Sequence, residues 1–194
     1  MNARLRRLMA DYEQIKTEFS GHPYITVTPV SGNPPDRYRV TYKLKGLRWD
    51  PRRRDVVVVD HHEAEVYLHD DYPRQKPQCT MLTDIFHPNF GPYICIGDHW
   101  AAGERLADVI IQIGDMIQYR NYNPRSPLNA EAAVWAIHNP HRLPVGNVDL
   151  YQPDIEVELV VPSEEDDLGI VLRPAPQDDD LDIYLGPAEE AVDA

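Results

Sequence analysis

Apolar residues near the start of the chain recur at the spacing of an amphipathic helix. Five of them are separated by three or four positions and would share one helical face: Leu5, Leu8, Tyr12, Ile15 and Phe19. The run Ser20-Gly21-His22-Pro23 follows, and Gly and Pro end helices. We therefore expect an N-terminal helix that packs one face against a core.

A β region is predicted next. Over residues 38–45, apolar side chains alternate with Arg, Thr and Lys, the period-two pattern of an antiparallel strand with one face in water. Further extended runs cover residues 25–30, 56–60 and 64–68. We expect these runs to form a four-stranded antiparallel meander.

Helical periodicity returns in the second half of the chain. A wide apolar stripe over residues 106–117 predicts one helix, and residues 130–138 predict another. The prolines Pro140 and Pro144 then interrupt helical structure. The order of elements indicates an α+β fold: N-terminal helix, meander, loop and C-terminal helices.

Charge divides the 194 residues into two parts. Residues 1–148 hold 18 Lys and Arg against 17 Asp and Glu, whereas residues 149–194 hold one basic and 15 acidic residues. We predict a domain over residues 1–145 and an acidic extension over 146–194. Neither part has the basic, aromatic-rich surface that nucleic acid requires, so nucleic acid is not an expected partner.

Two cysteines are too few for a disulfide framework, and no apolar stretch approaches the ~20 residues of a membrane span. Charged residues after Arg4, Arg6 and Arg7 leave no apolar segment for a signal peptide. We expect a cytoplasmic protein without a membrane partner.

The candidate chemistry lies at Cys95, eight residues after His87, which begins the triplet His87-Pro88-Asn89. Gly91, Pro92, Gly97 and Asp98 predict an irregular, accessible loop around this thiol. An exposed thiol can carry an acyl group, and the Asn89 amide could donate to the oxyanion formed when an amine attacks, a contribution of about 3 kcal/mol. A buried structural thiol is the alternative for Cys95, and it is the expected state of Cys79.

Histidines suggest two other kinds of site. His87 could deprotonate the thiol, as in a cysteine hydrolase. His61 and His62 precede Glu63, but adjacent histidines point to opposite faces of a strand and no second pair has ligand spacing. We expect neither a metal nor a bound cofactor.

Three segments together resemble the ubiquitin-conjugating enzyme family over roughly residues 1–140. The first is the His87-Pro88-Asn89 triplet with Ile94-Cys95. The second is the run Asp71-Tyr72-Pro73-Arg74-Gln75-Lys76-Pro77, which is similar to the family's Tyr-Pro-x-x-Pro-Pro segment with Lys76 in place of one Pro. The third is Asn123-Pro124-Arg125-Ser126-Pro127-Leu128-Asn129, which is similar to the family's Pro-rich loop. The resemblance implies that Cys95 accepts the C-terminus of a ubiquitin-like modifier from an activating enzyme and passes it to an amine. ATP is then spent at the activating enzyme.

The resemblance also assigns roles around the thiol. Asn89 would stabilise the oxyanion, while His87 and Pro88 would hold the turn. Ser126 matches the position where the family often places an Asp or Ser to activate the attacking lysine, and Asp98 could help it. A non-catalytic binding module of the same fold remains an alternative.

Partners of this family generally contact the first helix and two loops, which correspond here to Arg4, Arg7, Arg74 and Ala102. Arg74 and Ala102 differ from the aromatic and proline side chains frequent there, so we expect no conventional ligase. A system such as the bacterial ubiquitin-like conjugation operons fits better. Residues 155–161, 169–172 and 181–185 are short β-prone runs beside acidic residues and could add a strand to a modifier's sheet, be a disordered tail, or cover this chain's own surface.

Overall fold

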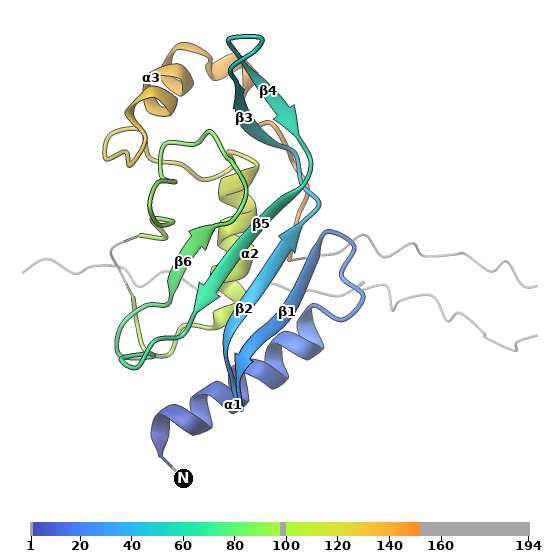
Figure 1. Cartoon of the computed structure of the whole chain (residues 1–194), viewed down its shortest axis with the longest axis vertical. Coiled ribbons are helices and arrows are strands. Elements are labelled where there is room, and N and C mark those ends of the chain that lie inside the picture. The colour runs from blue at the N-terminus through green and yellow to red at the C-terminus, as the bar shows by residue number, and fades with distance from the viewer. Residues whose placement is uncertain (1, 98–99, 152–194) are drawn as a thin grey trace, which may run out of the picture. The chain divides into compact units, whose positions relative to one another are not determined.

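The computed structural model describes residues 2–97 and 100–151 (Figure 1). Asp98 and the three β-prone runs predicted beyond residue 151 lie outside the described residues. The elements in chain order are α1 Ala3–Glu18, β1 Ile25–Gly32, β2 Pro35–Tyr42, β3 Gly46–Asp50, β4 Asp55–Val59, β5 His62–Tyr67, β6 Gln78–Met81, α2 Leu106–Ile117, α3 Ala130–His138 and a 3-10 turn Pro140–Arg142.

The three predicted helices are all present. Asn2 caps α1 by accepting a hydrogen bond from the backbone N–H of Leu5, and Leu8 and Ile15 bury its apolar face. The stripe predicted over residues 106–117 is α2, and the run 130–138 is α3. The expected α+β fold is confirmed.

The sheet has four antiparallel strands, but one of them is not the strand that the sequence indicated. Its order is β1-β2-β5-β6, whereas β4, the run predicted over 56–60, pairs only with β3 in a separate hairpin. The fourth strand is β6, which contains Cys79. Alternating apolar residues predict that a segment is extended, but its partner depends on the chain between, and here a whole hairpin is inserted between two paired strands.

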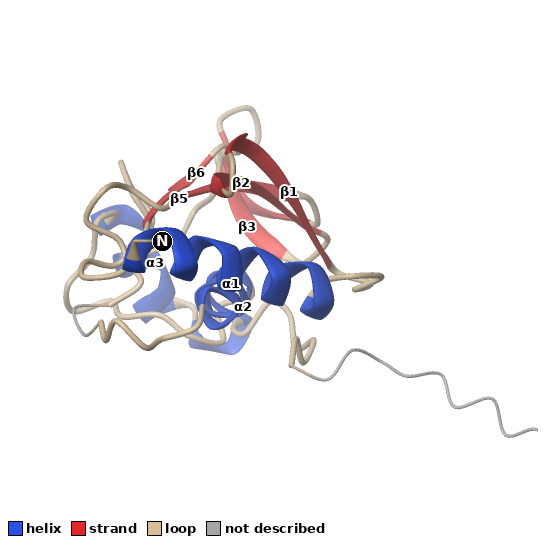
Figure 2. Cartoon of the chain, turned by 90° about the horizontal axis from the view of Figure 1, so that it is seen from below, coloured by secondary structure: helices blue, strands red, loops and turns tan. Residues whose placement is uncertain are grey.

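Helices α1 and α2 cover one face of the sheet (Figure 2). Every residue of α2 is buried or half-buried, and nine are buried among the core side chains. The hydroxyl of Tyr42 in β2 donates to the carbonyl of Ile110 in α2 at 3.0 Å, so sheet and helix are joined by a hydrogen bond inside the apolar core. Helix α2 is therefore a fixed support for the loops at its ends.

Residues 145–151 form an extended strap against α2. The backbone N–H of Val148 donates to Oε1 of Gln118 at 2.8 Å, and Leu150 is 2% exposed. A Cβ at Gly114 would lie 2.4 Å from Cδ1 of Leu150, so this glycine makes room for the strap inside the helix. Residues 146–151, which the sequence assigns to the acidic extension, thus include contacts with α2.

Candidate functional site

Cys95 opens onto a groove of about 280 Å³. Three segments of the chain form its walls: the loop at residues 89–97, which follows β6; helix α2; and the loop that precedes α3. The lining residues are Asn89, Tyr93, Cys95, Gly97, Gln112, Met116, Asn121, Asn123, Ser126, Pro127 and Leu128. The Cys95 thiol is free and half-buried, so a ligand in the groove can reach it.

The backbone around Cys95 is held on both sides of the thiol. Its own N–H donates to the carbonyl of Asn89 at 3.0 Å, and the N–H of Ile94 donates to the carbonyl of Cys79 at 2.7 Å. After it, the carbonyl of Ile96 accepts a 2.9 Å hydrogen bond from Nε2 of Gln112 in α2. The irregular loop predicted from the sequence therefore has a fixed backbone, and Gln112 is a contributor that no local sequence pattern marked.

Asn89 is 4% exposed, and its amide holds the opposite wall of the groove. Nδ2 donates to the carbonyl of Asn123 at 2.9 Å and to that of Ser126 at 3.4 Å, while Oδ1 accepts from the N–H of Asn123 at 2.7 Å. All of these bonds go to one loop. The side-chain amide of Asn89 thus joins this loop to the turn that precedes Cys95.

Pro88 extends the same connection to α3. Its carbonyl accepts from the backbone N–H groups of Leu128 at 2.7 Å and Asn129 at 2.9 Å. Asn129 in turn caps α3, because its side chain accepts from the N–H of Ala132 at 3.0 Å. The turn at residues 87–89 and the start of α3 therefore form one hydrogen-bonded unit.

His87 is fully buried behind the turn. Its Nδ1 accepts from the N–H of Asn89 at 3.1 Å, and its ring lies 4.6 Å from that of Phe90 and 4.5 Å from that of Tyr119. Burial lowers the pKa of the imidazole from 6.5 to about 3, although the nearby Asn121 carbonyl acts against this shift. A neutral ring that does not line the groove is poorly placed to act as the base of a cysteine hydrolase.

Cys79 is less accessible than Cys95. It is buried in β6, and burial raises the pKa of its thiol to about 12. Ser126 is exposed at the groove wall and belongs to the same loop as Asn123. The structure thus brings Cys95, Asn89 and Ser126 to one groove, whereas the fourth predicted residue, Asp98, is not among the described residues.

Arg7, predicted to face partners, is instead enclosed. Its side chain is 18% exposed, and Nε lies 2.9 Å from both carboxylate oxygens of Asp11. It also donates to the hydroxyl of Tyr72 at 2.7 Å and to the carbonyls of Ala102 and Glu104. These bonds tie α1 to two loops. Asp11, 2% exposed, lies between Leu8 and Ile15 on the buried helical face, a position where an acid in the sequence could have indicated such a pair.

The other predicted partner residues differ in accessibility. Arg4 donates to the carbonyls of Leu68 and His69 and is largely occupied within the chain. Arg74 is 81% exposed and forms a 3.0 Å ion pair with Asp71. Ala102 is exposed, but its carbonyl is engaged by Arg7. Of these four residues, Arg74 presents the most accessible charge.

Within residues 2–97 and 100–151, no three His, Cys, Asp or Glu side chains lie together in a way that could hold a metal ion. No helix of that same region has the length and hydrophobicity needed to cross a bilayer.

Comparison with known proteins points to one family. A family model described as "Ubiquitin-conjugating enzyme" matches residues 59–144, which include the turn, Cys95, the groove and α3. Ubiquitin-conjugating enzyme E2 S-A of Xenopus laevis is 29% identical over 135 residues, covering 60% of this chain and 56% of that protein. Ubiquitin-conjugating enzyme E2 13 of Saccharomyces cerevisiae is 33% identical over 82 residues, covering 40% and 52%. The chain thus spans about half the length of these relatives.

The fold has solved counterparts as well. A structure described as a ubiquitin-conjugating enzyme from Trypanosoma cruzi superposes with a TM-score of 0.50 at 16% identity, covering 69% of this chain and 89% of that one. At this identity the likeness concerns the fold, and it agrees with the arrangement of one helix, an antiparallel sheet and later helices.

Proposed function

We propose that this chain is a member of the ubiquitin-conjugating enzyme family, and that Cys95 carries a ubiquitin-like modifier as a thioester and transfers it to an amine. One observation supports this proposal most strongly: a free, half-buried thiol stands on a fixed backbone at a groove that joins three segments of the chain. A purely structural cysteine would need neither the groove nor the access, as Cys79 illustrates.

The proposed reaction has two steps. The Cys95 thiol loses its proton, and the thiolate attacks the thioester carbonyl that links the modifier to an activating enzyme. A new C–S bond forms, the old one breaks, and the activating enzyme's cysteine leaves as a thiolate that takes up a proton. An acceptor amine then attacks the Cys95 thioester, a C–N bond forms, the C–S bond breaks and Cys95 leaves as a thiolate. The amine must first lose a proton, which opposes the reaction by about three pKa units at neutral pH for a lysine.

Asn89 has a defined place in the second step. Its Nδ2 donates to two carbonyls, and the contact with Ser126 at 3.4 Å is longer than the 2.9 Å contact with Asn123. We infer that the oxyanion replaces the Ser126 carbonyl as an acceptor of Nδ2, while the 2.9 Å bond to Asn123 keeps the amide in place. In this proposal Asn89 both braces the groove wall and stabilises the oxyanion.

Acceptor and partners are assigned on similar grounds. Ser126 is exposed at the groove wall, where an incoming amine would pass, and we propose that it orients the amine with help from Asp98. Arg74 supplies the accessible charge for an activating enzyme or a ligase. Arg7, by contrast, would act through the position of α1, since its guanidinium is used within the chain.

The test is incubation with a candidate activating enzyme, modifier and ATP, followed by gel electrophoresis and intact mass with and without reductant. Wild type is expected to form a reductant-sensitive adduct, Cys95→Ser a reductant-resistant ester and Cys95→Ala none. Cys79→Ala serves as the matched control because it removes the buried thiol only.

An adduct on Cys95→Ala would place the modifier elsewhere and refute the proposal. Failure of wild type with every activating enzyme tried, despite an intact fold, would favour the non-catalytic binding module. Asn89→Ala separates loading from transfer: the oxyanion role predicts slower transfer by roughly 100-fold or more.

A further inference from the structure

Lys76 reaches the backbone that presents Cys95. Its ammonium donates to the carbonyl of Gly97, two residues after the thiol, although the two residues are 21 positions apart in sequence. Gly97 lines the groove and has φ +105°, a conformation that glycine adopts readily and other residues rarely do. The carbonyl that Lys76 contacts is therefore at a point where the backbone has unusual freedom.

The backbone of Lys76 is itself fixed. Its carbonyl contacts Nε2 of His69 at 3.0 Å, and Nδ1 of His69 accepts from the N–H of Asp71 at 3.2 Å. Pro77 follows and leads directly into β6. The half-buried lysine side chain thus extends from a fixed backbone. Within the described part of the chain, its ammonium forms no ion pair with a carboxylate that would compete with the Gly97 carbonyl.

Lys76 completes a set of three contacts around the nucleophile. The N–H of Cys95 bonds to the turn at Asn89, the carbonyl of Ile96 bonds to Gln112 of α2, and the carbonyl of Gly97 bonds to Lys76. Each contact comes from a different segment. The contact from Lys76 is the charged one, and charge-assisted hydrogen bonds are stronger than neutral ones.

We propose that Lys76 is a positioning residue for Cys95: its ammonium fixes the carbonyl of Gly97 and thereby the direction in which the thiol, and the thioester formed on it, faces the groove. The inference rests on the function proposed above. Without the contact, residues 95–97 lose one of the three hydrogen bonds described above that join them to other segments, and they lose it at a glycine with positive φ. Displacements of about 1 Å at a reacting centre can reduce rates by roughly 100-fold.

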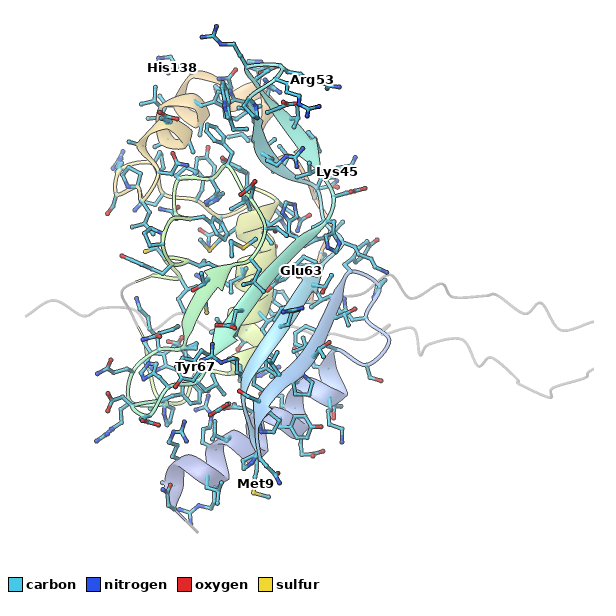
Figure 3. The ribbon with its side chains drawn as sticks, viewed as in Figure 1. Met9, Lys45, Arg53, Glu63, Tyr67 and His138 are labelled. Carbon is cyan, nitrogen blue, oxygen red and sulfur yellow. The ribbon has the colours of Figure 1, made fainter. Side chains whose placement is uncertain are left out.

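The experiment compares Lys76→Met, Lys76→Arg and Lys45→Met. Lys76→Met keeps the aliphatic stem and removes the donor, whereas arginine restores a charged donor. Lys45, labelled in Figure 3, is exposed between β2 and β3 and provides the matched loss of one positive charge. Each protein is loaded with modifier, separated from the activating enzyme, and followed as it discharges to increasing concentrations of a small amine.

We expect Lys76→Met to lower the maximal discharge rate on the order of 10-fold with little change in the half-saturating amine concentration. Lys76→Arg should recover most of the rate, and Lys45→Met should match wild type. A discharge rate of Lys76→Met within twofold of wild type would overturn the inference. So would a defect that arginine fails to rescue, or one confined to the half-saturating concentration.

Hydrogen exchange of the unloaded protein provides a measurement that needs no modifier. Lys76→Met should speed exchange in a peptide spanning residues 94–97 by roughly 10-fold, with other core peptides and the Lys45→Met protein unchanged. Unchanged exchange at 94–97 would contradict the positioning role. If wild type never forms a thioester, the proposed function fails while this measurement still decides whether Lys76 restrains the loop.

Discussion

Lowering the pH from 7 to 5 should destabilise the fold through the buried imidazole of His87. Burial lowers the pKa of this group to about 3, against an ordinary value of 6.5. Between pH 6.5 and about 3, His87 is therefore mostly protonated in the unfolded chain and mostly neutral in the folded chain. The stability that this group contributes is fully present above pH 6.5 and is lost as the pH falls toward 3.

The magnitude follows from linkage. Each pH unit between the two pKa values changes the free energy of unfolding by about 1.4 kcal/mol. His87 alone should therefore lower the free energy of unfolding by about 2 kcal/mol at pH 5. That is a large share of the stability of an ordinary domain. The pKa of His62 is also lowered by burial and acts in the same direction, whereas Asp11 and Asp115, whose pKa values are raised by burial, act in the opposite one.

The assay has to separate His87 from these other groups. Urea unfolding at pH 7, 6 and 5 yields the slope of stability with pH, and His87→Gln should reduce that slope by about one proton, whatever its effect on absolute stability. NMR of the ring nitrogens reports the protonation of His87 directly. An imidazole that titrates above pH 5.5 in the folded protein, or an unchanged slope in His87→Gln, would refute the reasoning and reopen the question of a histidine base.

Three further outcomes are expected. Iodoacetamide should label Cys95 in the native protein and reach Cys79 only in denaturant, because the latter thiol is buried with a raised pKa; intact mass counts the adducts. Asp11→Ala should lower the free energy of unfolding by about 3 kcal/mol, since it leaves an enclosed guanidinium without its carboxylate; a loss below 1 kcal/mol in urea would mean that the pair is solvated. Gly114→Ala should destabilise by about 1 kcal/mol, the clash with Leu150 outweighing the gain in helix propensity, and should become stabilising when combined with Leu150→Ala.

Much of the fold could be predicted because its strongest signals are local. The stripe over residues 106–117 and the run 130–138 appear as α2 and α3 because helical periodicity depends on neighbouring residues alone. The pairing of the strands could not be read in this way: the extended run at 56–60 was identified, but its partner in β3 depends on the path of the chain. The burial of Leu150 also depends on long-range contacts, because it packs against α2 although its sequence neighbours are polar.

In the candidate site, too, residues of a local motif could be predicted, and residues placed by long-range packing could not. Cys95 and the triplet at 87–89 could be identified because they form a compact motif. Gln112 could not, since only the packing of α2 brings its amide to the Ile96 carbonyl. The enclosure of Arg7 could not be predicted for a related reason: an arginine on a helix is expected in solvent, and its enclosure requires Asp11 and two loops to converge on it.

The loop opposite Cys95 is closed at both ends by two adjacent residues. Asn89 holds its beginning at Asn123, and Pro88 holds its end at Leu128 and Asn129. Lengthening a loop whose ends stay pinned costs little, about 0.6 kcal/mol for each doubling. The tip around Arg125 can therefore change in sequence or grow without moving the nucleophile, which makes this segment the place where a related chain, or an engineer, could alter the choice of acceptor while keeping the chemistry intact.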